Sequence, residues 1–211
     1  MPSLFEELRP RTWGDVCGQH EALTKIKALR PRGFGGRAFW ISGPSGTGKS
    51  SIARLLAGEI ADEMGTFEVS AEKLTLKGIE EIERRYRLRA MGKGGWGIIV
   101  NEAHGLSRPC VTHLLTVLER IPRHVVWIFT TTDAGLLKLC DGCLDAHPLL
   151  SRCTILNTKV NEIAFANVAH HAARTSGLDG APFAAYLGLV RECKGNLRAV
   201  LGEVEAGRMR Q

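Results

Sequence analysis

Short apolar segments alternate with longer amphipathic segments through the middle of the chain. Five runs of apolar and β-branched residues predict buried strands over residues 38–42, 66–70, 97–101, 124–132 and 153–157. Between them, apolar residues recur at helical spacing and predict helices over residues 50–64, 77–92 and 109–121. Strands separated by helices of this length usually pair in parallel, with both faces of the sheet covered. The pattern therefore predicts an α/β fold with a parallel five-stranded sheet flanked by helices.

The two ends of the chain follow a different pattern. Residues 1–38 predict an entry segment with one helix over residues 21–29 and a link rich in proline and glycine. After about Val160 no strand pattern remains, and three short helices are predicted over residues 161–177, 181–195 and 196–210. We predict an α/β domain over residues 1–159 and a small helical domain over residues 160–211.

Composition and charge are those of an ordinary globular protein and exclude few functions. The chain has 44% apolar and 24% charged residues, as globular proteins do, and its net charge of +6 is compatible with a polyanionic partner. No apolar run reaches the roughly 20 residues needed to cross a bilayer. The N-terminus contains acidic residues and does not resemble a signal or transit peptide. We expect a cytoplasmic protein without membrane contact.

The segment GPSGTGKS, residues 43–50, matches the phosphate-binding motif G-x-x-x-x-G-K-[ST] between a predicted strand and a predicted helix. Its glycines allow backbone N–H groups to converge on phosphate oxygens, and the helix N-terminus adds partial positive charge. Lys49 is expected to reach the β- and γ-phosphates, and the Ser50 hydroxyl to ligate Mg²⁺. The motif predicts a nucleoside triphosphate site formed by Gly43, Pro44, Ser45, Gly46, Thr47, Gly48, Lys49, Ser50 and Ser51.

The segment IIVNEAH, residues 98–104, predicts the second half of this site at the carboxyl end of a strand. Glu102 is the candidate for polarising the attacking water, because a carboxylate can take up its proton. Asn101 stands where nucleotide-hydrolysing proteins usually carry aspartate. Its amide oxygen can still accept from a Mg²⁺-bound water, so we expect weaker magnesium binding and slower turnover with ATPase activity retained. The rival interpretation is a site that binds ATP without hydrolysing it.

Five motifs in order resemble the clamp-loader branch of the AAA+ ATPases, which includes the bacterial gamma/tau subunit and the small subunits of replication factor C. Besides the phosphate motif they are ELRPRTWGDVCGQHEAL (7–23), the block from residue 101 to residue 133, LLSRC (149–153) and GNLRAVL (195–201). The resemblance covers nearly the whole chain. It implies an AAA+ P-loop NTPase fold followed by a three-helix lid, with ATP and Mg²⁺ as cofactors.

The same resemblance implies roles for individual residues in nucleotide binding. Val16 and Cys17 would line the adenine pocket, largely through their backbone. Thr132, with Thr131 beside it, falls at the position that senses the γ-phosphate. Arg198 falls at the position that reaches the phosphates from the lid.

Arg152 falls at the arginine-finger position of the family, where it would act on ATP held by a neighbouring subunit. Without the surrounding motif, it would be interpreted as a surface arginine at the start of a strand. The finger implies other AAA+ subunits as partners, in a homo- or hetero-oligomer. The family further implies a sliding clamp and primer-template DNA, with ATP binding and hydrolysis coupled to clamp loading. Two alternatives stay open, a scaffold subunit with little or no hydrolysis and an AAA+ ATPase of recombination or fork maintenance.

The segment RRYRLR, residues 84–89, predicts a basic helix surface for the sequence-independent binding of DNA phosphates. The candidate contacts are Arg84, Arg85, Arg87 and Arg89, with Arg108 a weaker one. The alternative is a solvated helix face whose arginines are opposed by glutamates one turn earlier.

Two further departures from the family concern cysteines and length. Cys140, Cys143 and His147, with Cys153 nearby, could supply metal ligands, although free thiols in a loop are the simpler interpretation. The isolated cysteines Cys17, Cys110 and Cys193 are expected to be buried free thiols. The residues that follow the lid are too few for the collar domain of clamp loaders. That leaves either a truncated chain or a compact relative.

Overall fold

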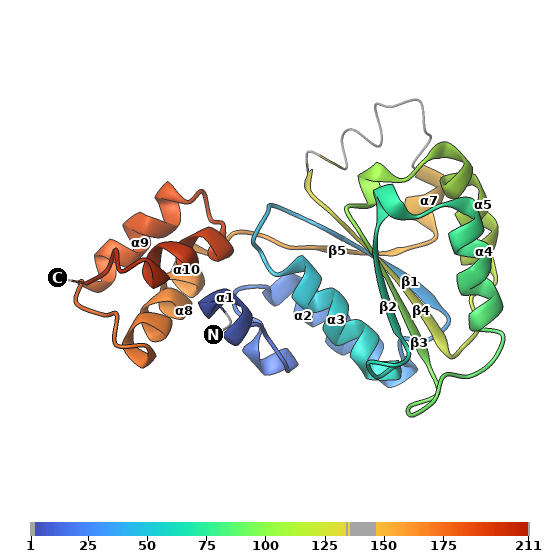
Figure 1. The fold of residues 1–211 in the computed structure, drawn as a ribbon, viewed down its shortest axis with the longest axis horizontal. Helices are drawn as coiled ribbons and strands as arrows, with labels where there is room; N and C mark the ends of the chain where they lie inside the picture. The colour runs from blue at the N-terminus through green and yellow to red at the C-terminus, as the bar shows by residue number, and fades with distance from the viewer. Residues whose placement is uncertain (1–2, 134, 136–146, 211) are drawn as a thin grey trace.

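A five-stranded parallel sheet forms the centre of the protein, as the sequence predicts. The computed structural model describes residues 3–133, 135 and 147–210 (Figure 1). All strand pairs are parallel, in the order β2-β3-β4-β1-β5. The strands are β1 (Arg37–Ser42), β2 (Thr66–Ser70), β3 (Trp96–Asn101), β4 (Val125–Thr131) and β5 (Thr154–Asn157).

Helices cover both faces of this sheet. On one face lie α2 (His20–Leu29) and α3 (Lys49–Ile60); on the other lie α4 (Leu76–Arg85), α5 (Arg108–Glu119) and the short α7 (His147–Ser151) (Figure 1). The alternation of side chains along a strand decides which helices each residue meets. In β4, Val126 and Ile128 belong to the cluster on the α3 side, while Trp127 and Phe129 belong to the cluster on the α5 side. All four are fully buried, so this strand stabilises both layers.

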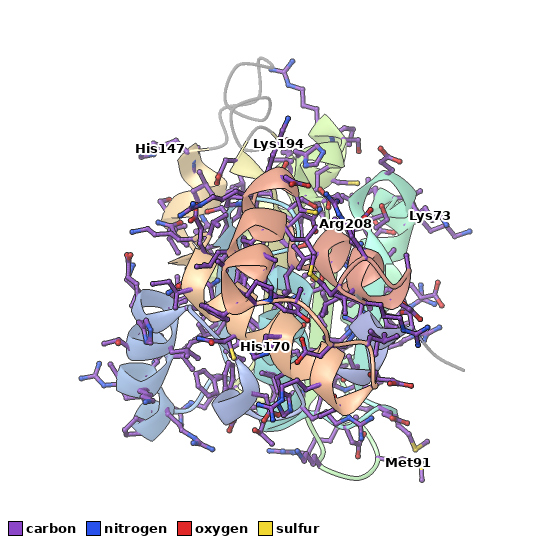
Figure 2. All side chains as sticks on the ribbon, turned by 90° about the vertical axis from the view of Figure 1, so that its left-hand side faces the viewer. Lys73, Met91, His147, His170, Lys194 and Arg208 are labelled. Carbon is purple, nitrogen blue, oxygen red and sulfur yellow. The ribbon has the colours of Figure 1, made fainter. Side chains whose placement is uncertain are left out.

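A separate apolar cluster holds the C-terminal helices together. They are α8 (Glu162–Thr175), α9 (Phe183–Glu192) and α10 (Leu197–Glu205), whose buried Phe165, Tyr186 and Val200 meet in one core. We call these three helices the lid; Figure 2 views the molecule from their side, with His170 of α8 labelled and Arg208 labelled just after α10. The N-terminal helix α1 (Leu4–Glu7) contacts α10, and Leu4 joins the lid core. The domain boundary near residue 159 stays a prediction.

The helix predicted over residues 77–92 is shorter than expected. It ends at Arg85, because the Tyr86 ring is buried and the Tyr86 carbonyl accepts a hydrogen bond from the His124 ring at 2.8 Å. Arg87 and Arg89 therefore lie beyond the helix, and the prediction of four arginines on one helix is wrong for these two.

The described part of the chain contains no helix with the length and apolar character of a membrane span. The longest described helix, α8, has 14 residues, against the roughly 20 that a bilayer requires.

A buried amide connects the N-terminal segment, the phosphate loop and the strand-to-lid connection. Gln19 is 3% exposed; its Nε2 donates to the carbonyls of Thr47 at 3.3 Å and Lys159 at 2.8 Å. Its Oε1 accepts from the Lys159 N–H at 2.9 Å. The contact with Thr47 is buried and the two contacts with Lys159 are partly buried, so the side chain fixes the loop relative to the segment that leads into the lid.

We expect Gln19→Ala to lower the free energy of unfolding by about 1–3 kcal/mol, because it leaves the Lys159 backbone groups unpaired. Urea denaturation followed by circular dichroism measures this change. His20→Ala is the matched control, since His20 is the exposed next residue. Equal stability of the two variants would contradict a connecting role for Gln19.

Candidate functional site

The segment between β1 and α3 folds as a tight loop with almost no space around two of its glycines. At Gly43 the backbone φ is +144°, and a Cβ would lie 2.2 Å from the Thr158 hydroxyl. At Gly46, with φ of +75°, a Cβ would lie 2.0 Å from Oδ1 of Asn196, the residue that caps α10. The loop is therefore packed between the end of β5 and the start of a lid helix, and these positions require glycine.

Lys49 begins α3 at the mouth of this loop and is 8% exposed. Its ammonium donates to the carbonyls of Gly43 at 2.8 Å and Pro44 at 2.7 Å. Burial lowers the pKa of Lys49, and the nearby carboxylates of Glu102 and Asp133 oppose that shift. A buried cation whose partners are mainly neutral carbonyls gains from an anion beside it, and a phosphate fits that need.

A pocket opens above the loop, and most of its walls come from the N-terminal segment, the phosphate loop and the lid. The N-terminal segment supplies an apolar wall that includes Phe5, Leu8, Pro10, Val16 and Cys17, together with Arg9. The phosphate loop supplies Ser45, Gly46, Thr47, Gly48, Lys49, Ser50 and Ser51, and the lid supplies Phe165, Val168, Leu197, Arg198 and Leu201. One side of the pocket is thus apolar and the other is rich in backbone N–H groups, as a nucleotide requires.

Glu102 follows β3 and lines the same pocket. Its backbone is left-handed, with φ of 53° and ψ of 49°, a conformation that costs energy for a residue with a side chain. The conformation starts the short helix η4 (Ala103–Gly105) and leaves the carboxylate half exposed, 3.5 Å from Nδ1 of His104. Strain of this kind is typical of functional positions.

The end of β4 places a different threonine at the pocket from the ones predicted. Thr130 lines the pocket, whereas Thr131 is fully buried and its hydroxyl lies 3.2 Å from Nδ1 of His104. The Thr132 hydroxyl accepts from the Gly135 N–H at 3.1 Å. His104 consequently stands between Thr131 and Glu102. A γ-phosphate contact by Thr131 or Thr132 stays a prediction.

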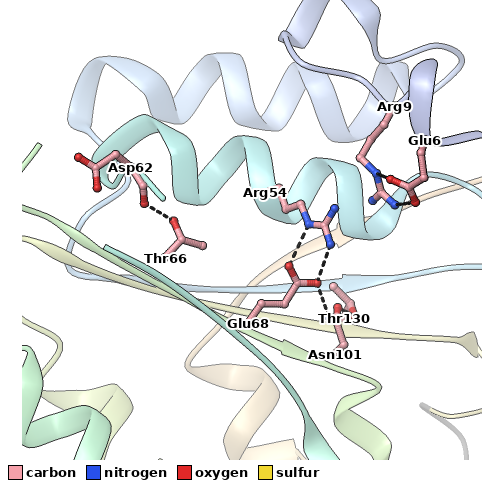
Figure 3. A network of polar contacts seen from close by, with 8 residues as sticks. All are labelled: Glu6, Arg9, Arg54, Asp62, Thr66, Glu68, Asn101 and Thr130. Carbon is pink, nitrogen blue, oxygen red and sulfur yellow. Dashed lines mark hydrogen bonds and ion pairs between the residues drawn. The ribbon is translucent and has the colours of Figure 1, made fainter. Parts of the chain in front are cut away.

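Asn101 ends β3 and has two side-chain partners that the sequence analysis did not anticipate. Its Nδ2 donates to Glu68 at 2.7 Å, and its Oδ1 accepts from the Thr130 hydroxyl at 2.9 Å (Figure 3). Sequence spacing could have suggested Thr130, the neighbour of Asn101 on the adjacent strand, but gave no signal for Glu68. Ser50 and Glu102 line the pocket, whereas Asn101 lies behind Thr130 and does not line it. All three carry oxygen donors of the hard kind that Mg²⁺ prefers, so their chemistry fits that ion.

Arg198 lies on α10 and points at the pocket, where its guanidinium carbon is 4.6 Å from the centre of the Phe5 ring. Arg9 approaches the same ring at 5.1 Å and also lines the pocket. Sequence analysis identified Arg198 but missed Phe5 and Arg9, because nothing in the spacing reveals that α1 packs against the lid. The pocket thus has two arginines beside Lys49.

Arg152 does not line the pocket of its own chain. It follows α7, where its Nη1 donates to the Pro148 carbonyl at 2.7 Å and its guanidinium forms an ion pair with Glu119 of α5. The side chain is 30% exposed and is held on the opposite face of the sheet from α3.

The predicted DNA-contact arginines lie at opposite ends of the strands, some near the amino ends and one near the carboxyl ends. Helices α4 and α5 each connect the end of one strand to the start of the next, so both run opposite to the strands (Figure 1). Arg84 and Arg85, at the end of α4, therefore lie near the amino edge of the strands, and Arg85 pairs with Glu81 at 3.0 Å. Arg108, at the start of α5, lies near the carboxyl edge, on the side of the pocket. One patch containing all five arginines does not form.

The described cysteines differ in exposure. Within residues 3–133, 135 and 147–210, no group of three or more histidine, cysteine or acidic side chains could hold a metal ion. Cys140 and Cys143 lie outside the described residues. Burial raises the pKa of Cys153 to about 12. Cys110 is buried as predicted and Cys193 partly so, but the prediction of a buried thiol is wrong for Cys17, which is exposed at the rim of the pocket.

Comparison with known proteins agrees with this geometry. Residues 39–139 match the family of ATPases associated with various cellular activities (AAA). The DNA polymerase III subunit tau of Escherichia coli is 28% identical over 94% of this chain, and the gamma subunit of Buchnera aphidicola (subsp. Baizongia pistaciae) is 29% identical over 79%. The chain spans only 33% and 50% of those two relatives.

Solved structures agree on the fold. The Holliday junction branch migration motor RuvB of Thermotoga maritima superposes with a TM-score of 0.70 at 20% sequence identity. The match covers 94% of this chain and 64% of that one. The five-stranded sheet, phosphate loop and flanking helices therefore form the AAA+ P-loop NTPase fold.

We expect ATP with Mg²⁺ to slow the alkylation of Cys17 strongly, because a nucleotide in the pocket would cover this thiol. Burial, aided by Asp15, raises the pKa of Cys17, so the thiolate is more abundant at alkaline pH, where labelling is best run. Mass spectrometry of iodoacetamide-treated protein gives the rate for each cysteine. Cys193, on the lid and outside the pocket, is the internal control; equal protection of both thiols would argue against this placement.

Proposed function

Because the chain is an AAA+ protein similar to clamp-loader subunits, we propose that it binds ATP with Mg²⁺ and hydrolyses it. The observation that carries this proposal is the meeting of Lys49, Glu102 and Arg198 in one pocket above a fully formed phosphate loop. Lys49 and Arg198 supply positive charge for the phosphates, and the loop supplies backbone N–H groups. Val16 and the apolar residues of the N-terminal segment and lid would hold the adenine ring.

In this proposal Glu102 acts on the attacking water. The oxygen of the water forms a bond to the γ-phosphorus, the bond to the bridging oxygen breaks, and Glu102 accepts the proton. Bound Mg²⁺ would neutralise phosphate charge, held by Ser50 and, through water, by Asn101. Asn101 lacks the charge of aspartate, so we infer slow turnover rather than none.

We further propose that hydrolysis is coupled to loading a sliding clamp on primer-template DNA, in a complex with other AAA+ subunits. The similarity to DNA polymerase III subunits over most of the chain supports this assignment. Of the candidate DNA contacts, Arg108 lies on the pocket side, and Arg84, Arg85, Arg87 and Arg89 would form a second contact region. A scaffold subunit that binds ATP without hydrolysing it is the alternative that Asn101 favours.

Glu102→Gln should keep ATP affinity but lower turnover by about 10²–10⁴-fold, because the amide cannot accept the proton. Turnover is measured for the chain alone, with primed DNA and with a sliding clamp. Lys49→Ala is the comparison variant, which should lose ATP binding itself. A native chain that binds ATP but shows no turnover in any of these conditions would support the scaffold alternative.

Arg152→Ala should leave ATP binding intact and remove stimulated hydrolysis in the assembled complex, with a loss of about 10³-fold or more. The reason is that Arg152 would stabilise charge on ATP held by a neighbouring subunit. Arg120→Ala, an exposed arginine beside Glu119, is the matched control and should behave like the native chain.

A mixing experiment tests action between subunits. In a homo-oligomer, Arg152→Ala chains and Lys49→Ala chains should each be inactive but recover activity together, since one supplies the ATP site and the other the arginine. Normal stimulated turnover of Arg152→Ala on its own would remove the arginine-finger assignment.

A further inference from the structure

A chain of polar contacts runs from helix α3 across the three strands β2, β3 and β4 (Figure 3). Arg54 of α3 donates two hydrogen bonds to Glu68 of β2, from Nε to Oε2 at 2.9 Å and from Nη2 to Oε1 at 3.2 Å. Glu68 Oε1 accepts from Asn101 Nδ2 at 2.7 Å, and Asn101 Oδ1 accepts from the Thr130 hydroxyl at 2.9 Å. Arg54 is four residues from Ser50, so both lie on one face of α3.

The chemistry of these partners determines which way the Asn101 amide faces. An ionised carboxylate only accepts hydrogen bonds, so the amide NH₂ must face Glu68. Both carboxylate oxygens of Glu68 accept hydrogen bonds from the Arg54 guanidinium, so this carboxylate is held in place as the acceptor for the Asn101 NH₂ group. The orientation of the amide is thereby kept.

The opposite end of the amide faces the phosphate side of the sheet. Asn101 Oδ1 is turned toward Thr130 on β4, which lies between β3 and β1 in the sheet. Strand β1 runs into the phosphate loop, and Thr130 lines the pocket. An amide oxygen has two lone pairs, so Asn101 keeps acceptor capacity after bonding to Thr130.

We propose that Glu68, held by Arg54, is a positioning residue that fixes the Asn101 amide with its oxygen toward the nucleotide site. The inference rests on the proposed function, because the oriented oxygen would accept a hydrogen bond from a water molecule bound to the Mg²⁺ of the nucleotide. A free asparagine could present either its oxygen or its NH₂ group, and the NH₂ group repels a cation. Glu68 excludes the orientation in which the NH₂ group faces the cation. An uncharged asparagine can then present an oxygen acceptor at a position where a carboxylate is usual.

The test is a double-mutant cycle with Glu68→Ala, Asn101→Ala and the double variant. The readout is the Mg²⁺ concentration that gives half-maximal binding of a fluorescent, slowly hydrolysed ATP analogue. Glu68→Ala should raise this concentration on the order of 10-fold, as for other partners of metal ligands. In the Asn101→Ala background the same change should have no further effect, because Glu68 acts through Asn101.

Two more variants distinguish a loss of amide positioning from a loss of folding stability. Glu68→Gln keeps an acceptor oxygen and should recover part of the native magnesium response. Glu63→Ala removes an exposed glutamate from the turn before β2 and should match the native chain. The denaturation midpoint of each variant in metal-free buffer shows whether the fold is intact and gives the coupling between positions 68 and 101 independently of nucleotide.

The outcomes distinguish this inference from the proposed function. If the native chain binds the analogue but Glu68→Ala leaves the magnesium requirement unchanged, or raises it equally in both backgrounds, the positioning role is overturned and the ATP site stands. If the native chain binds no analogue at any Mg²⁺ concentration, the proposed function fails. In that case coupling in the denaturation midpoints would still support the Glu68–Asn101 contact, and its absence would overturn it.

Discussion

The close packing of two glycines in the phosphate loop is the constraint on which the rest of the site depends. Gly43 is pressed against Thr158 at the end of β5, and Gly46 against Asn196 at the start of a lid helix. Interiors packed this closely cannot absorb a displacement without moving neighbouring groups. The shape of the loop therefore depends on the positions of the sheet and the lid relative to each other. Gln19 helps to hold these positions through its contacts with Thr47 and Lys159.

Polar contacts around the loop also fix the positions of the side chains that would act on the nucleotide. Lys49 is held by carbonyls of the loop itself, and Glu102 adopts a left-handed backbone conformation directly after β3. His104 lies between Glu102 and the last residue of β4. The ends of the neighbouring strands β3 and β4 thus meet through side chains, which explains how a parallel sheet gathers functional residues from distant parts of the sequence.

Sequence alone predicted the sheet, its helices and the phosphate loop, because these depend on local periodicity and on one contiguous motif. It failed where a distant residue decides a local outcome. The end of α4 depends on His124, which is 38 residues away and takes the Tyr86 carbonyl. The partners of Asn101 lie on two other strands, and the pocket wall formed by Phe5 depends on helix packing. Such contacts leave no periodic trace in the sequence.

The Phe5 ring holds the Arg198 guanidinium against the apolar wall of the pocket. To reach an anion in the pocket, the guanidinium must give up its cation–π contact, which is worth about 0.5–2 kcal/mol depending on exposure. Since about 1.4 kcal/mol corresponds to one factor of ten, this competition can weaken nucleotide affinity by about 2- to 30-fold. An apolar ring near the N-terminus thereby sets part of the threshold concentration at which the lid arginine engages its ligand.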